Sequence, residues 1–134
     1  MIRFRRIANG FVVMLPLLSV AGGGCAPGVR VDVPEFHGRV VDAESRPVMG
    51  ATVRLSRQGQ SVAVVTSKPD GTFSHPEESR WVAYFGGADA AVQIFSVNAA
   101  MGTNRAPETK IYADFRTWME CTPVTNDLGD LHLR

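Results

Sequence analysis

Residues 37–73 read HGRVVDAESRPVMGATVRLSRQGQSVAVVTSKPDGTF. Small and apolar side chains recur at every second position along two segments of this stretch, which is the pattern of a strand with one buried face. They are Gly38 and Val40 in the first segment, and Ala51, Val53 and Leu55 in the second. We therefore expect two antiparallel strands whose inward faces carry these residues.

The segment between these two strands has the composition of a turn. It covers residues 43–50 and includes Pro47 and Gly50. The ring of Pro47 fixes φ near the value that a turn needs, and Gly50 is free to take a positive φ. The chain is therefore expected to reverse direction here.

A second turn follows the third expected strand, which covers residues 61–66. The sequence Lys-Pro-Asp-Gly occupies positions 68–71, where Asp70 can hydrogen-bond to its own backbone and Gly71 can adopt the left-handed conformation. Phe73 then lies in a fourth strand. Four strands within about forty residues leave no room for the crossover helices that parallel strands require, so the chain is expected to be all-β.

Further strands are expected downstream, giving a single seven-strand sandwich of two sheets. They are the segments 80–85, 91–97 and 128–133. The segment 91–97, AVQIFSV, is apolar on both faces, as a central strand would be. Proline and glycine favour loops at residues 74–79 and 98–108.

The segment 110–121, KIYADFRTWMEC, fits two structures. Ile111, Phe115 and Trp118 are spaced as on one face of a helix, but aromatic residues also suit an irregular edge strand. We favour a strand or extended segment with one helical turn, with an inserted short helix near 111–120 as the alternative.

The quoted stretch resembles the carboxypeptidase regulatory-like domain through GRVVDAESRPVMGATVRL and TSKPDGTF. The resemblance covers a quarter to a third of the chain. It implies a Greek-key sandwich of the transthyretin-like type, usually an accessory or binding module without catalysis. The turn and core residues that carry the pattern are Gly38, Pro47, Gly50, Ala51, Asp70, Gly71 and Phe73.

The first residues have the features of a bacterial export signal. Three arginines precede the apolar run FVVMLPLLSV at residues 11–20, which is too short to span a membrane. Small residues then lead to Cys25 in an arrangement that resembles a lipobox, in which the cysteine carries diacylglycerol through a thioether. The alternatives are an ordinary cleaved signal with an unmodified Cys25, and a twin-arginine signal based on Arg5 and Arg6.

These features divide the chain into a lipoprotein signal peptide at 1–24, a lipidated cysteine and tether at 25–34, and one sandwich domain at 35–134. Because Ala26 and not aspartate follows the cysteine, the sorting rule for such lipoproteins implies the outer membrane, facing the periplasm. The chain has a net charge of +1, but three arginines leave with the signal. Nucleic-acid binding is therefore not expected, since it needs a clustered basic face.

Two sets of residues could form metal sites or have structural roles. The histidines His37, His75 and His132 could supply three zinc ligands, and the acids Asp42, Asp70, Asp127 and Asp130 could surround calcium. Their spacing matches no known loop or close ligand pair, so structural roles are preferred and no cofactor is expected. Cys121 is expected to be a buried thiol.

The sequence contains no motif of a known catalytic site. Transthyretin-like hydrolases of purine catabolism end in Tyr-Arg-Gly-Ser, whereas this chain ends in Leu-His-Leu-Arg. We therefore expect a non-catalytic envelope module that binds a protein or has a structural role. The alternative is a carbohydrate- or peptidoglycan-binding module that uses exposed rings; the candidates are Trp81, Tyr84, Tyr112 and Trp118.

Overall fold

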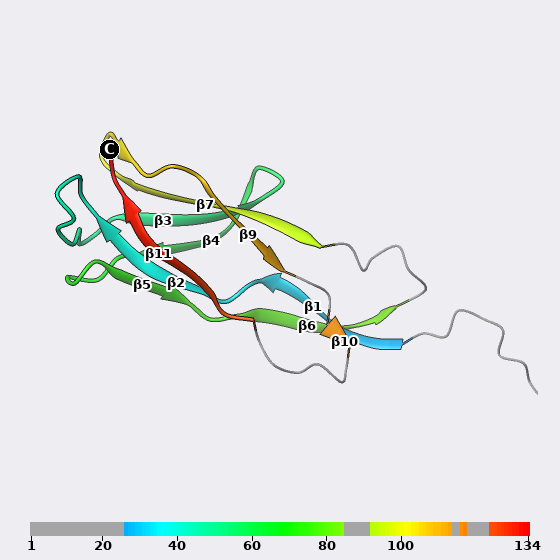
Figure 1. Ribbon diagram of the computed structural model, residues 1–134. Coiled ribbons are helices and arrows are strands. Elements are labelled where there is room, and N and C mark those ends of the chain that lie inside the picture. Colours follow the sequence, from blue (N-terminus) through cyan, green and yellow to red (C-terminus); the bar gives the residue numbers. More distant parts are fainter. Residues whose placement is uncertain (1–25, 85–91, 114–115, 118–123) are drawn as a thin grey trace, which may run out of the picture.

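The computed structural model describes residues 26–84, 92–113, 116–117 and 124–134, and these residues form strands and turns without any helix (Figure 1). Consequently, the described part has no apolar helix long enough to cross a membrane. The strands are β1 (Ala26–Val33), β2 (Phe36–Val41), β3 (Thr52–Arg57), β4 (Gln60–Thr66), β5 (Thr72–His75), β6 (Glu78–Tyr84), β7 (Gln93–Met101), β8 (Asn104–Arg105), β9 (Thr109–Ala113), β10 (Arg116–Thr117) and β11 (Asn126–His132).

The strands belong to three hydrogen-bonded sheets. The first has the order β11-β2-β5, the second has the order β4-β3-β7-β8 with β9 also paired to β7, and the third has the order β10-β1-β6. β11 runs parallel to β2, while the other pairs are antiparallel. The third sheet continues the first, because β1 leads into β2 and β5 leads into β6 with only two residues between them.

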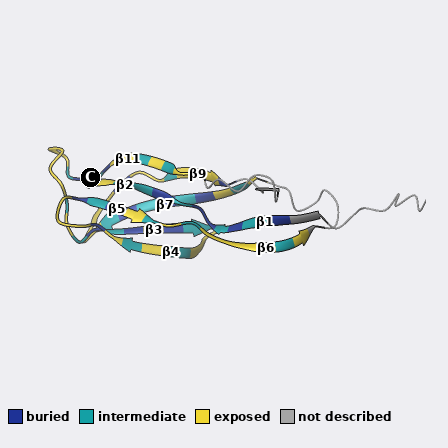
Figure 2. Ribbon diagram, turned by 90° about the horizontal axis from the view of Figure 1, so that it is seen from below, coloured by how far each residue is buried: buried dark blue, intermediate teal, exposed yellow. Residues whose placement is uncertain are grey.

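The first and second sheets pack face to face as a β-sandwich with one core. Each sheet contributes every second residue of its strands, as the alternation in the sequence predicts (Figure 2). The largest fully buried side chains are Phe36, Phe73, Phe95, Leu55, Val40, Val41, Val53 and Val97. Burying a ring or branched side chain of this size contributes about 1.5–3 kcal/mol, so these positions supply most of the hydrophobic stabilisation.

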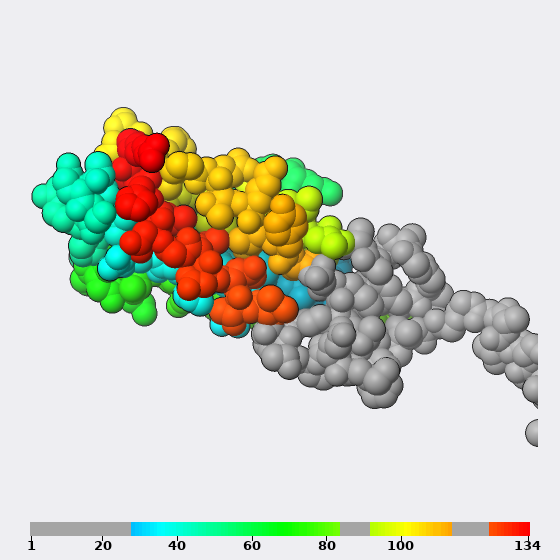
Figure 3. All heavy atoms as spheres, viewed as in Figure 1, coloured from blue at the N-terminus to red at the C-terminus, as the bar shows by residue number. Residues whose placement is uncertain are grey.

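The last segment of the described chain closes one side of the sandwich. Leu133 donates its backbone N–H to Val41 at 2.9 Å, and Arg134 and Arg105 exchange two backbone hydrogen bonds of 3.1 Å. Figure 3 shows the segments of β9 and β11 side by side on this face. Residues 126–134 therefore connect the edge of the first sheet to the edge of the second.

Two expected loops are shorter than the sequence indicates. Only Pro76 and Glu77 separate β5 from β6, so most of the segment 74–79 is strand. Likewise, β7 continues through the expected loop as far as Met101 and turns at Gly102, where φ is 59°, into β8. The end of β7 consists of small residues with a weak strand preference, so the local sequence does not indicate a strand there. The strand continues because it pairs with β3.

Two other expectations are also corrected. The segment 26–33, expected to be a tether, is strand β1 and pairs with β6. Within 111–120, the described residues 111–113 and 116–117 lie in β9 and β10, so the extended prediction is confirmed for them and they contain no helix. Ile111 and Ala113 are buried while Tyr112 is exposed, which is the period of a strand.

Candidate functional site

The second predicted turn is held by Asp70 and Gly71. The Oδ1 atom of Asp70 accepts the backbone N–H of Thr72 at 3.0 Å and its hydroxyl at 2.6 Å. These hydrogen bonds, the hydroxyl first, lower the pKa of Asp70. Gly71 has φ 77°, and a Cβ there would lie 2.6 Å from the carbonyl oxygen of Val40. Both residues therefore have structural roles.

The first turn is tied to the sheet by a residue that the sequence analysis missed. Ser67 is buried, and its hydroxyl accepts the backbone N–H of Ala51 at 2.9 Å and donates to the carbonyl of Val48 at 2.7 Å. Gly50 has φ 76°, and Pro47 forms a bridge with the end of β2. A serine immediately after a strand and before Lys-Pro-Asp-Gly was the only available signal in the sequence.

Gly38 and Phe73 meet across β2 and β5, where they are directly opposite each other. A Cβ on Gly38 would lie 2.8 Å from the Phe73 ring and 2.9 Å from the carbonyl of Gly129. The ring of Phe73 is 2% exposed and packs against Phe36, with ring centroids 6.2 Å apart. The absence of a side chain at Gly38 thus makes space for the ring.

The solvent face of the first sheet carries a polar row. Here Arg39 donates to both carboxylate oxygens of Asp130, from Nε at 3.0 Å and from Nη2 at 2.8 Å. This paired hydrogen bond lowers the pKa of Asp130 and raises that of Arg39. Two residues before Arg39, on the same face of β2, His37 lies between Asp127 on β11 and Ser74 on β5.

The residues Ser74, His37 and Asp127 have the types of a hydrolytic triad but not its geometry. The His37 Nε2 atom lies 3.6 Å from Asp127 Oδ1, which already accepts the backbone N–H of Gly129 at 2.9 Å. The side chains of His37 and Asp127 are 44% and 71% exposed. A general base is oriented by a hydrogen bond of about 2.6–3.2 Å, whereas His37 and Asp127 make a loose contact on the surface at 3.6 Å.

The three histidines do not converge. His75 is directly opposite the inward-facing Phe36 and stacks on its ring with a centroid distance of 5.6 Å. His37, the next residue of β2, therefore points to the other face. His132 lies beside Val41 at the far end of β11. Among the described residues, no group of three histidine, cysteine or acidic residues could hold a metal ion.

The four acids also lie apart, each with its own donors. In the first turn, Asp42 accepts the backbone N–H groups of Glu44 and Arg46 at 3.0 and 2.9 Å and the Arg46 Nε at 2.8 Å. These interactions, the backbone N–H of Arg46 first, lower the pKa of Asp42. The carboxylates therefore stabilise turns and strand pairs, and the calcium hypothesis has no support in their positions.

An apolar patch lies on the outer face of the second sheet. We define it as Val92, Ile94 and Tyr112, which are 54%, 52% and 54% exposed. Ile94 and Tyr112 are directly opposite each other on β7 and β9, and Val92 precedes Ile94 by two positions. The sequence predicts that the segment 91–97 is apolar on both faces. This is correct, but the opposite sheet covers only its inner face. Neighbouring exposed apolar side chains of this kind mark interaction surfaces.

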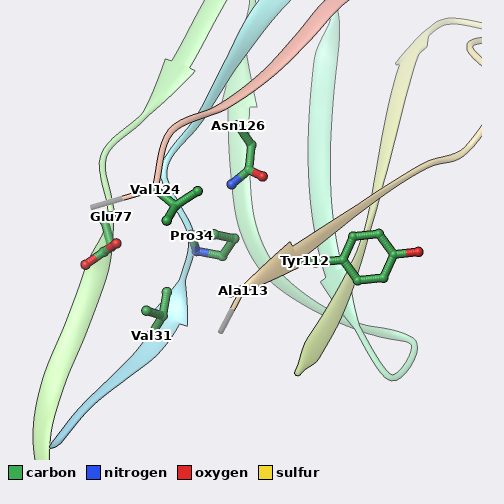
Figure 4. Close-up of a pocket in the computed structure, with 7 residues that line it drawn as sticks. All are labelled: Val31, Pro34, Glu77, Tyr112, Ala113, Val124 and Asn126. Carbon is green, nitrogen blue, oxygen red and sulfur yellow. The ribbon is translucent and has the colours of Figure 1, made fainter. Parts of the chain in front are cut away.

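A small pocket adjoins the apolar patch through Tyr112. The cavity volume is about 30 Å³, which is enough for one or two water molecules. Figure 4 shows Val31, Pro34 and Val124 gathered where β1 meets β2. The lining residues are Val31, Pro34, Glu77, Tyr112, Ala113, Val124 and Asn126. The pocket suits a small apolar group and not a metabolite, since ligand pockets are about tenfold larger.

The aromatic candidates do not form one platform among the described side chains. Trp81 on β6 is 65% exposed, and Tyr112 on β9 is 54% exposed, so each ring can reach solvent from a different sheet. The Tyr84 side chain and Trp118 lie outside the described residues, as do the lipidation candidate Cys25 and the thiol of Cys121.

Comparison with known proteins gives a loose structural likeness. No protein family matches the chain, and no curated protein matches it either. Among solved structures, the 5-hydroxyisourate hydrolase of Klebsiella pneumoniae is similar, with 16% identity and a TM-score of 0.43, over 75% of this chain and 90% of that one. An overlap this loose carries no argument about activity.

Proposed function

We propose that this chain is a lipid-anchored, non-catalytic module of the bacterial cell envelope that binds a protein partner. The observation that carries the proposal is the apolar patch of Val92, Ile94 and Tyr112, whose exposed side chains are neighbours on the second sheet. Water in contact with three adjacent apolar side chains is released when a partner covers them, at about 25 cal/mol per Å². A complementary apolar surface is therefore the expected partner chemistry.

The anchor is proposed from the sequence. The basic start, the short apolar run and Cys25 after small residues resemble a lipoprotein signal. Retention at the inner face of the outer membrane would place the module in the periplasm, where its partner would be another envelope protein. The non-catalytic role is supported by the exposed, loosely spaced polar row, which lacks a positioned base.

Photo-crosslinking in cells tests the partner. A photoreactive residue at Ile94, more than half exposed, should give a discrete adduct with one envelope protein. The same residue at Ser74, exposed on the polar row of the first sheet, is the matched control and should not give this adduct. Equal adducts from both positions, or none from Ile94, would contradict the proposal.

Glycan binding is a second candidate, favoured by Trp81. This ring is 65% exposed on β6 and can stack on a sugar face. Trp81→Ala should then abolish a change in tryptophan fluorescence on addition of peptidoglycan fragments, while Ile94→Ala leaves the response intact. If the wild-type fluorescence does not respond to the fragments, glycan binding by Trp81 is excluded.

A further inference from the structure

Strand β4 lies at an edge of the second sheet. Its only partner among the described strands is β3, so its other side presents backbone N–H and C=O groups to solvent. The strand has the sequence QSVAVVT, seven residues without a charge, a proline or a glycine. Figure 2 shows it with mostly exposed and intermediate residues. Long, uncharged edge strands are ready to pair with another strand.

The other edges carry features that oppose such pairing. β11 contains Asp127 and Asp130, and its register shifts around Gly129, which has φ 61°. β5 is only four residues long and is followed by Pro76. β9 presents Lys110 on its outer face, opposite Ser96. Charges, irregularities, prolines and short length are the known protections of sheet edges, and β4 has fewer of them.

β4 has one irregularity, near its beginning. The register with β3 shifts where Ser56 pairs with Ser61 and Leu55 pairs with Ala63. From Ala63 to Thr66 the register is regular. Half of the strand therefore keeps the flat backbone geometry that a new neighbour requires, and this half includes Val64, the exposed apolar residue of the strand at 56%.

We propose that β4 is an interaction surface where a second copy of this chain pairs, with the two β4 strands antiparallel about a two-fold axis near Val65, so that residues 64–66 of the two copies pair with one another. A two-fold interface brings a surface against itself, so it must be self-complementary. β4 meets this requirement because none of its residues is charged and no like charges face each other. The Val64 side chain of each copy becomes covered by the other strand.

The nearest charges permit this pairing. Arg54 is directly opposite Val64 on β3, on the same exposed face. In the pair, the two Arg54 residues are separated by three strand spacings, about 14 Å, which exceeds the screening length of about 8 Å at physiological salt. Lys68, beyond the end of β4, lies near enough to Asp70 to lower the pKa of that carboxyl. A partner of another kind would require a neutral strand of its own, whereas the second copy already supplies one.

Sedimentation velocity of the full chain in mild detergent and reductant tests the pairing over a concentration series. The wild-type chain should shift from one copy to two as the concentration rises. Val64→Lys places two ammonium groups at about the diagonal cross-strand distance of 7–8 Å in the pair. It should raise the dissociation constant about tenfold or more.

Tyr112→Lys is the matched control. It introduces the same charge at a residue of the same sheet with nearly equal exposure, 54% against 56%, but on β9. It should leave the pairing unchanged, and circular dichroism should show that both variants are folded. A wild-type chain that remains single at every concentration, pairing that survives Val64→Lys, or pairing lost in Tyr112→Lys would overturn the proposal. Pairing through β4 uses neither the anchor nor the apolar patch, so the presence or absence of this pairing leaves the proposed function untouched.

Discussion

At the scale of single residues, close backbone approaches decide which side chains are tolerated. Gly71 combines φ 77° with a Cβ position only 2.6 Å from the carbonyl of Val40 and 3.0 Å from Pro47. The carbonyl of Gly71 also accepts the N–H of Val40 at 2.8 Å, so neither backbone can withdraw without losing this bond. The glycine is required both by its dihedral angle and by the space around it.

Gly71→Val should therefore destabilise the domain clearly. A non-glycine residue in the left-handed region costs about 1–3 kcal/mol, and a branched side chain belongs to the upper part of that range. Urea denaturation of the purified chain should show a lower midpoint with the slope unchanged. Gly59→Ala provides a comparison: φ is 80° there, but nothing lies within 4 Å of the added Cβ, so the cost should be smaller.

Phe73 and Ser74 test which face of β5 is buried. Phe73→Ala removes a ring that is 2% exposed and should cost about 3–5 kcal/mol. Ser74→Ala, at an exposed position, should stay within about 0.5 kcal/mol. Denaturant melts of the two variants give the comparison, and equal losses would mean that the register of β2 with β5 is wrong.

At the scale of elements, the ion pair between Arg39 and Asp130 links the parallel strands β2 and β11. Both side chains lie on the exposed face, and they are directly opposite each other at the first position after the register shift at Gly129. The folded state lowers the pKa of Asp130 relative to an unfolded carboxyl, for which about 3.9 is usual. The folded state consequently binds a proton at this group less readily than the unfolded state.

This difference predicts the direction of the pH dependence. The contribution of Asp130 to stability is present above the unfolded pKa and is lost as the pH falls through the lowered folded pKa. Asp130→Asn should thus melt at a lower temperature than the wild type at pH 6. Because asparagine does not titrate, the two melting temperatures should approach each other below about pH 4. A difference that persists unchanged into acid would contradict this role.

At the scale of the whole molecule, local signals predicted one half of the fold better than the other. Between Gly38 and Phe73, alternation and turn residues specify strands with little help from distant contacts. Beyond Phe73, the boundaries depend on pairing: Ala99 is buried because it lies opposite Val53 on β3, which no local pattern indicates. The segment of β7 is apolar on both faces, so its sequence alone does not tell which face is covered by the opposite sheet. It therefore could not indicate that Ile94 is exposed.

The proposed lipid anchor also belongs to the scale of the whole molecule. Cys25→Ser removes the thiol that a diacylglycerol group would occupy, so the variant should move from the membrane fraction to the soluble periplasmic fraction. Mass spectrometry of the wild-type chain should show the added mass of the lipid on an N-terminal cysteine. A soluble wild-type chain with an unmodified N-terminus would contradict the lipoprotein proposal.

The late position of β11 affects how the chain can fold during synthesis. The ion pair between Arg39 and Asp130 cannot form until Asp130 has been synthesised, 91 positions later in the sequence. Until then, β2 lacks its parallel neighbour. The β3–β4 hairpin needs no such delay, since its strands are separated by two residues. A chain arrested before Asn126 would thus have a formed hairpin but one open side of the first sheet, with Phe36 and Val40 incompletely covered. Such intermediates bind chaperones or aggregate. The rate at which the final segment is synthesised therefore sets how long the incomplete fold is exposed to aggregation.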